Sequence, residues 1–319
     1  MHRRKFITLL TGAAAVLPPV ASAQPAKVYT IGVLTLPNPE PLLQALREGL
    51  GDAGYVEGGN LRLEIRSAPG QPGLQLAKAA ELVRLKVDLI VTFYTPSALA
   101  AKQATRDIPI VMAGAGDPVA TGLVPSLARP GGNITGQSSG GAEVAAKSLE
   151  LIRELVPGAR RVGVLADETD PFAKTYVAQI SQAAPRIGME AEQFITRPDQ
   201  SLEPIFKTLT DRRVGALLIQ GSIVRKDMLD LAIAHRLPAL TSIRLGPPLG
   251  ALASYGSDYL ALARSSAAYV DRILKGAKPA DLPVAFPTKF VLIINLKTAK
   301  TLGIDVPMFL QQRADEVIE

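Results

Sequence analysis

The order of strand and helix patterns is the feature that most constrains this 319-residue chain. Apolar runs typical of buried strands, such as 28–34 and 88–93, alternate with amphipathic helical patterns such as 74–85. Such alternation with short connections predicts parallel sheets whose crossover helices cover both faces. A proline- and glycine-rich stretch at 129–133 interrupts the rhythm, which then restarts. We therefore expect an α/β fold with two doubly wound parallel-sheet lobes, each of ordinary domain size. A single (β/α)₈ barrel is the alternative that the interruption and the tail disfavour.

The C-terminal part of the chain predicts how the lobes are joined. It contains a long helical pattern at 259–274, a proline-punctuated segment at 279–287 and a late strand at 289–295. If each lobe takes a piece of this tail, the chain crosses between the lobes more than once. Several parallel crossings form a multi-segment hinge, and a hinge over a cleft can clamp a ligand. We expect lobe 1 to contain 24–136 and 257–284, and lobe 2 to contain 137–256 and 285–319.

The N-terminal residues 1–23 have the three parts of an export signal. Three basic residues come first, an apolar run at 6–16 follows, and Ala21-Ser22-Ala23 is an A-x-A cleavage site. The apolar run is too short to span a bilayer. Paired arginines suggest the twin-arginine route, with the general secretory route as the alternative. We expect cleavage after Ala23 and a periplasmic location.

Composition excludes several classes of function. The chain has no Cys, which removes disulfides, thiolate metal sites, cysteine nucleophiles and a lipid-anchored cysteine. His235 is the only histidine outside the signal, so a multi-histidine metal site is impossible, and we expect no cofactor. Cleavage removes three of 35 basic residues and none of the 29 acidic ones, which leaves a net charge of +3. No basic run remains that would favour nucleic acid.

Ligands in open parallel sheets lie beyond the carboxyl ends of the strands, so the residues that follow each strand are candidates. The clearest such segment is 93–97, in which Thr95 is a suitable N-cap and Pro96 a suitable first helical residue. Amide groups near Ser97 and Ala98 would then favour an anion such as a carboxylate. Ordinary helix capping is the alternative. Tyr94 would contribute a wall of the pocket.

Acidic residues follow two further strands. Asp117 could accept a ligand ammonium group, or it could begin a turn before a proline. Asp167, Glu168 and Asp170 could bind a cation, or they could cap the next helix. The other candidates at strand ends, among them two aromatic residues that could wall a pocket, are Leu36, Gln137, Phe172, Gln220, Ser222, Tyr255 and Asp258.

Residues 136–140 match the G-x-S-x-G pattern of a serine hydrolase. Ser138 would be the nucleophile, with an acid (Asp167 or Asp170) and His235 following in the expected order. The nucleophile elbow needs a strong apolar strand before the serine, and 133–135 is short and polar for that role. No Walker A sequence is present, and no G-x-G-x-x-G follows a strand. The sequence therefore favours a protein that is not an enzyme.

Longer segments carry a family resemblance. The chain resembles the periplasmic solute-binding proteins of ABC transporters, specifically those of the tryptophan/tyrosine type, from the signal to the last residue. The segment 126–136 (SLARPGGNITG) is especially characteristic. The other segments that carry the resemblance are 31–34, 54–60, 79–84, 95–102, 116–119, 274–283 and 295–300.

The resemblance implies a type I periplasmic-binding fold with two lobes, a three-segment hinge and no catalysis. It implies that Thr95 and Ser97 face the cleft and hold a carboxylate, and that Asp117 lies at the rim. It makes 136–138 a crossing between lobes and His235 a marker of the fold. The chain departs from the family pattern at Phe93 and Tyr94, where the resemblance implies small residues. The aromatic ligand class is therefore not carried over.

These observations together predict an exported receptor for a small metabolite, an amino acid or a related carboxylate, bound between two lobes. Lobe closure would present a shape that a membrane ABC permease recognises. We expect a monomer, with the small molecule and the permease as partners. A ligand-sensing module for a membrane receptor is the alternative, and an exported serine hydrolase is a weaker one.

Overall fold

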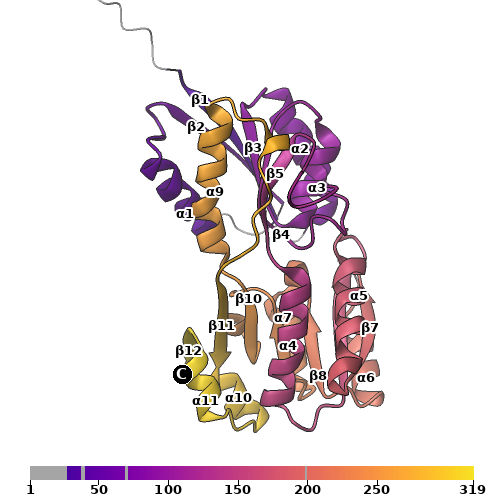
Figure 1. The fold of residues 1–319 in the computed structure, drawn as a ribbon. Coiled ribbons are helices and arrows are strands. Elements are labelled where there is room, and N and C mark those ends of the chain that lie inside the picture. The colour runs from indigo at the N-terminus through magenta and orange to yellow at the C-terminus, as the bar shows by residue number, and fades with distance from the viewer. Residues whose placement is uncertain (1–26, 37–39, 69–70, 198–199) are drawn as a thin grey trace, which may run out of the picture.

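The structure is a computed structural model that describes residues 27–36, 40–68, 71–197 and 200–319. It has two lobes, one above the other in Figure 1, each built on its own sheet. The expected α/β class with two doubly wound lobes is confirmed. The signal at 1–23 lies outside the described residues.

Lobe 1 contains a five-stranded sheet in the order β2-β1-β3-β4-β5, and all its strand pairs are parallel. Alternate side chains of one strand point to opposite faces, so Ile31 and Val33 join one apolar cluster while Leu34 joins another. Helices cover both clusters, which is why the strands are apolar throughout. The elements of the first segment of this lobe are β1 (Tyr29–Thr35), α1 (Glu40–Asp52), β2 (Leu61–Ser67), α2 (Gln75–Arg84), β3 (Leu89–Phe93), α3 (Thr95–Ala104), β4 (Ile110–Ala115) and β5 (Ile134–Ser138).

Lobe 2 contains a seven-stranded sheet in the order β12-β11-β10-β9-β8-β6-β7. Its two faces are again covered, with separate clusters around Ile152 and Phe206. Its elements are α4 (Gly141–Leu155), β6 (Arg161–Asp167), α5 (Ala173–Ala183), β7 (Glu190–Thr196), α6 (Glu203–Asp211), β8 (Ala216–Ile219), α7 (Lys226–Ala234), β9 (Ala239–Thr241), α8 (Gly246–Leu249), β10 (Ala253–Ser257), β11 (Phe290–Asn295), α10 (Leu296–Leu302), α11 (Met308–Arg313) and β12 (Glu316–Ile318).

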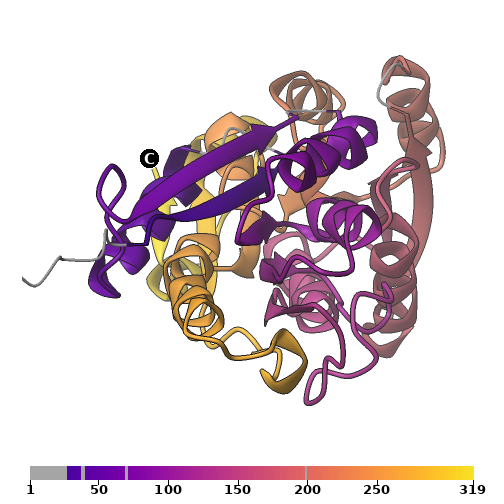
Figure 2. The same ribbon diagram turned by 90° about the horizontal axis from the view of Figure 1, so that it is seen from above.

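The chain passes between the lobes three times. It leaves lobe 1 after β5, returns after β10 as the long helix α9 (Tyr259–Leu274), and enters lobe 2 again before β11. Figures 1 and 2 show α9, coloured orange, lying against lobe 1, where it packs on α1. The crossings are joined by hydrogen bonds, such as Ser138 N to Ala285 O (2.9 Å) and Asp258 N to Lys289 O (3.2 Å). This arrangement is a multi-segment hinge.

Two strands differ from the sequence-based expectation. Strand β5 forms although 133–135 is polar, because it pairs with β4 and the buried Thr135 hydroxyl has a partner, Leu282 O (2.5 Å). Strand β11 runs antiparallel to β10 within an otherwise parallel arrangement. The reason is topological, since β10 ends at the hinge on its way to lobe 1 and β11 begins at the hinge on its way back.

Candidate functional site

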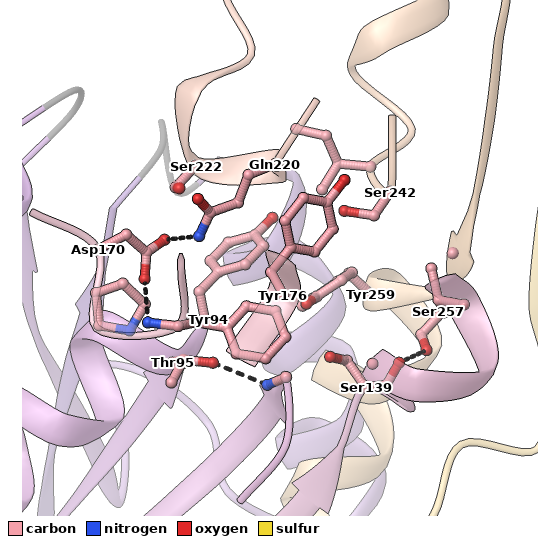
Figure 3. Close-up of a pocket in the computed structure, with 18 residues that line it drawn as sticks. Tyr94, Thr95, Ser139, Asp170, Tyr176, Gln220, Ser222, Ser242, Ser257 and Tyr259 are labelled. Carbon is pink, nitrogen blue, oxygen red and sulfur yellow. Dashed lines mark hydrogen bonds between the residues drawn. The ribbon is translucent and has the colours of Figure 1, made fainter. Parts of the chain in front are cut away.

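A cavity of about 60 Å³ lies between the lobes, beside the hinge. Residues that follow β3, β4, β6, β8 and β9 line it, so it lies at the carboxyl ends of the strands, where open parallel sheets bind ligands. Figure 3 shows how the polar side chains and tyrosines converge on this space. The side chains that line the cavity from lobe 1 and the hinge include Tyr94, Thr95, Pro96, Ser139, Ser257 and Tyr259, and those from lobe 2 include Val144, Asp170, Phe172, Tyr176, Gln220, Ser222, Ser242 and Ile243.

Thr95 begins helix α3 at the floor of the cavity. Its Oγ1 accepts a hydrogen bond from Gly116 N at 2.8 Å, so the hydroxyl ties the end of β3 to the end of β4. The sequence-based expectation that Thr95 is the N-cap is wrong by one residue, because Tyr94 occupies that position and supplies no side-chain cap. The first turn of a helix has amide groups without intrahelical partners. In α3, however, Pro96 has no N–H and Ala98 N donates to Tyr94 O (3.2 Å), so the expected contribution of Ala98 is wrong and the Thr95 amide is the first-turn donor that lies at the cavity.

Four aromatic side chains surround the space. Tyr94 and Tyr259 are stacked, with ring centroids 4.6 Å apart and planes 27° apart. Phe172 and Tyr176, one helical turn apart in lobe 2, lie 6.2 Å apart. Burial raises the pKa of Tyr259 to about 12, although the nearby Ser139 side chain opposes that rise. These phenols are therefore neutral and act as apolar walls with polar tips.

Asp170 is the acid in the cavity. It is 4% exposed, its Oδ2 accepts from Gln220 Nε2 (2.6 Å), and its Oδ1 accepts from Phe172 N (2.8 Å). Burial raises the pKa of Asp170 to about 6, against the opposing effect of the hydrogen bond from Phe172 N. The charge of Asp167 raises it further. Among the described residues that line the cavity, none is Lys, Arg or His.

The lobes contact each other at the cavity rim. Gln179 Nε2 on α5 donates to Asp117 Oδ2 of lobe 1 at 3.0 Å. The Phe172 ring lies over two glycines, because a Cβ added to Gly116 would come within 2.5 Å of the ring and one added to Gly141 within 3.1 Å. Side chains of lobe 2 thus fit against backbone of lobe 1 and the hinge.

The structure brings five of the sequence-predicted residues to the cavity: Tyr94, Thr95, Phe172, Gln220 and Ser222. Three predicted residues of lobe 1 do not line it. Ser97 Oγ donates to Gln75 Oε1 (3.0 Å), while Ala98 and Leu36 are buried. Asp117 lies at the rim, where its Oδ1 also accepts from Ala120 N (3.0 Å).

The other predicted residues have structural partners of their own. Gln137 Nε2 donates to Leu262 O (2.8 Å) and so joins the hinge to α9. Asp167 Oδ1 accepts from Thr169 N (2.7 Å), and the exposed Glu168 pairs with Arg197. None of these three lines the cavity, as far as the described residues show.

Tyr255 and Asp258 lie near the last crossing rather than on the cavity wall. Tyr255 stacks on Phe290, with centroids 5.7 Å apart. Asp258 caps α9 through Ala261 N (3.1 Å) and pairs with Lys289 Nζ (2.9 Å). Burial would raise the pKa of Asp258, but the hydrogen bonds from Lys289 and Ala261 N lower it below its usual value.

Sequence reasoning did not select several residues that line the cavity. Asp170 was one of three adjacent acids, and nothing in the sequence separates it from Asp167 and Glu168. Tyr176 lies four residues after Phe172. This spacing places both side chains on one helix face, so the sequence alone could have identified Tyr176. Tyr259 and the serines at 139, 242 and 257 come together only through the hinge and the end of β9.

The G-x-S-x-G pattern belongs to the hinge. Ser138 ends β5, and its Oγ accepts from Gly140 N at 3.1 Å. His235 lies after α7, where its Nδ1 forms a hydrogen bond with Thr210 Oγ1 (3.1 Å) and its Nε2 lies 3.8 Å from Glu203. Each residue thus has local partners. Within the described ranges, no three His, Asp or Glu side chains are grouped as metal ligands would be, and no helix is long and apolar enough to cross a membrane.

Two lobes, a three-segment hinge and a lined cavity at the carboxyl ends of the strands define a solute-binding protein of the type I periplasmic class. The profile of the family described as ABC transporter substrate binding protein matches residues 31–318, so the chain belongs to that family. It is 30% identical over 283 residues to the tyrosine-binding protein of Clostridioides difficile strain R20291, covering 86% of this chain and 81% of that one.

Two solved structures bear on the arrangement of the lobes. A Streptococcus pneumonia ABC domain in complex with L-Trp is 28% identical, with a TM-score of 0.82, and the match covers 92% of this chain and all of that one. The ligand-free, open structure of a Clostridium difficile substrate-binding protein with adhesive properties is 25% identical, with a TM-score of 0.69 over 91% and 99% of the two chains.

Proposed function

We propose that the chain is the exported receptor of an ABC importer and that it binds an α-amino acid as a zwitterion between its lobes. The observation that carries this proposal is the buried carboxyl group of Asp170 on a cavity wall that has no basic side chain among the described residues. A buried carboxylate without a cation is unfavourable, and a ligand ammonium group supplies that cation.

Asp170 is held in position for this role. Gln220 donates to one carboxyl oxygen and accepts from Asp167 N (3.0 Å), so its amide has a fixed orientation. Phe172 N binds the other oxygen. A carboxylate with fixed partners and a raised pKa gains most from an ammonium group, because the pairing favours its charged form. Asp170 therefore replaces Asp117 as the proposed ammonium partner.

The ligand carboxylate is assigned to the start of α3. The Thr95 amide and the helix dipole favour an anion there, and Thr95 Oγ1 is fixed beside that amide. Ser97 is not part of this assignment, because it does not line the cavity and its hydroxyl donates to Gln75. A carboxylic acid that lacks an ammonium group would bring a second negative charge to Asp170. The proposal therefore narrows the ligand class from carboxylates in general to amino acids.

The relatives support an amino acid ligand, since one is named a tyrosine-binding protein and another was solved with L-Trp. Export is supported by the signal-like sequence of residues 1–23. Closure of the lobes on the ligand would shift the population toward the form that the permease recognises. A sensing role remains the alternative, and loss of labelled amino acid uptake in cells that lack this chain, restored by the chain together with its permease, would favour transport.

The test is a thermal-shift and calorimetric comparison on the purified chain 24–319, after native mass spectrometry for retained ligand. Each amino acid is paired with its analogue that has a hydroxyl in place of the ammonium group. We expect stabilisation by the amino acid alone, by about 2.7 kcal/mol at a hundred times Kd. Asp170→Asn should abolish it, and Glu168→Gln, an exposed acid two residues away, should not. Equal binding of both members of a pair, or unchanged binding by Asp170→Asn, would refute the assignment.

A further inference from the structure

Tyr94 has a backbone conformation that side chains rarely adopt. Its φ is 68° and its ψ is 159°, a region populated almost only by glycine. The other non-glycine residues with positive φ in the described chain are Lys86, Arg213 and Arg236, and each lies two residues after the end of a helix, where such values are usual. Tyr94 instead precedes a helix and lines the cavity. Strain of this kind persists only where the surroundings impose it, and it concentrates at functional sites.

The ring of Tyr94 is held by the packing around it. It stacks on Tyr259, with centroids 4.6 Å apart. Tyr259 in turn packs on Gly114, where an added Cβ would come within 2.7 Å of the ring. Figure 3 shows the Tyr94 ring among the residues that enclose the cavity. The stacked pair is therefore a rigid wall rather than a side chain free to swing aside.

The space left beside this wall is small. The cavity has a volume of about 60 Å³, and at roughly 10–15 Å³ for each enclosed water it holds about four to six waters. An α-amino acid with a short side chain has this size, whereas an indole or phenol side chain does not fit beside the four aromatic rings already present.

We propose that Tyr94 determines specificity by occupying the place of a large ligand side chain, so that the cleft takes amino acids with small side chains and excludes tryptophan. This inference rests on the proposed function, because it assumes an amino acid bound through Asp170 and α3. The proposal gives the backbone strain at Tyr94 a role. A glycine at this position would relax the backbone, but it would also enlarge the cavity. The competing role, a stacking surface for an aromatic ligand, predicts the opposite effect of removing the ring.

The experiment compares L-alanine and L-serine with L-tryptophan by calorimetry on the chain 24–319. Wild type should bind the better of the two small amino acids at least about tenfold more tightly than L-tryptophan. Tyr94→Gly should shift that ratio by about tenfold or more in favour of L-tryptophan. The variant should still unfold in one cooperative thermal transition. Tyr94→Phe, which keeps the ring, should leave the ratio unchanged.

Tyr94→Asn provides a second small side chain, because asparagine tolerates positive φ better than most residues. It should change the ratio in the same direction as Tyr94→Gly. Tighter binding of L-tryptophan than of the small amino acids by wild type, or weaker tryptophan binding in both small variants, would overturn the proposed role of Tyr94 while leaving the amino acid receptor intact. Failure of wild type to bind any amino acid would overturn the proposed function itself.

Discussion

Gln179 on lobe 2 donates a hydrogen bond from its Nε2 to Asp117 Oδ2 on lobe 1, across the rim of the cavity, at 3.0 Å. This contact exists only when the lobes are close together. The covalent connection between the lobes is the three crossings of the hinge, which allow rotation. The bond therefore contributes to closure of the lobes more than to folding stability. Removing it should change ligand affinity while leaving the melting temperature nearly unchanged.

Gln179→Ala should shift the lobes toward the open arrangement. A hydrogen bond to a charged acceptor contributes about 1.5–3 kcal/mol, less where water replaces it, so ligand affinity should fall by about tenfold. The melting temperature of the ligand-free chain should change little. Small-angle scattering should show a larger radius of gyration before ligand addition. Gln44→Ala, which removes an exposed glutamine on α1, is the matched control and should match wild type in both measurements.

A glycine at the rim should be necessary for closure. In Gly116→Ala the new Cβ would lie about 2.5 Å from the Phe172 ring, which is closer than real Cβ contacts. The lobes can relieve this overlap by opening, so affinity should fall while the thermal transition stays cooperative. Gly132→Ala is the control, because its Cβ would meet nothing within 4 Å. Equal ligand affinities of the two variants, measured by calorimetry, would show that the Phe172 ring does not pack on Gly116 when the lobes close.

The raised pKa of Asp170 makes stability depend on pH. Its folded-state pKa of about 6 lies above the ordinary value of 3.8, so the folded chain binds the extra proton between those values. Stability from this group is therefore fully present below about pH 4 and is lost as pH rises through 6, by up to about 3 kcal/mol. Denaturant unfolding from pH 4 to 7 should show this fall in wild type. The fall should be smaller in Asp170→Asn and unchanged in Glu168→Gln.

Ligand binding should have the opposite pH dependence. An ammonium group pairs with the ionised form of Asp170, so affinity should rise about tenfold between pH 5 and 7 and level off above 7. Calorimetry across this range, with an amino acid that binds at pH 7, checks the slope. An affinity independent of pH would mean that the ammonium group lies elsewhere in the cleft.

Local patterns were sufficient to predict most of the fold. The apolar run of β3 and the leucine spacing of α1 depend on neighbours in sequence, and both form as expected. Strand β5 was not expected, because its burial depends on the crossing that contains Leu282, almost 150 residues later. Non-local packing of this kind leaves no periodic signal in the sequence.

The candidate site was harder to predict for the same reason. The rule that ligands lie beyond strand ends found Thr95 and Gln220, since each directly follows or nearly follows a buried strand. The same rule could not distinguish Asp170 from Asp167 and Glu168. What separates the three acids is that the turn directs the carboxyl group of Asp170 toward Gln220, and the sequence does not show this. Nor does the sequence show the φ of Tyr94, which follows from how β3 enters α3.

Two glycines in helix α1 should respond in opposite directions to the same substitution, and they test how the tail helix α9 is attached to lobe 1. Gly49 faces α9, where an added Cβ would lie 2.2 Å from Arg264 O, a backbone atom that cannot move aside. Gly49→Ala should therefore force α1 and α9 apart and destabilise the chain by about 1–3 kcal/mol. Gly51 is exposed, with nothing within 4 Å of its Cβ position, so Gly51→Ala should stabilise the chain by about 0.5–1 kcal/mol through helix propensity.

Denaturant unfolding measures both changes, and destabilisation of similar size in the two variants would contradict the packing of α9 on α1. Because α9 connects two crossings of the hinge, Gly49→Ala should also weaken ligand binding, whereas Gly51→Ala should leave it unchanged.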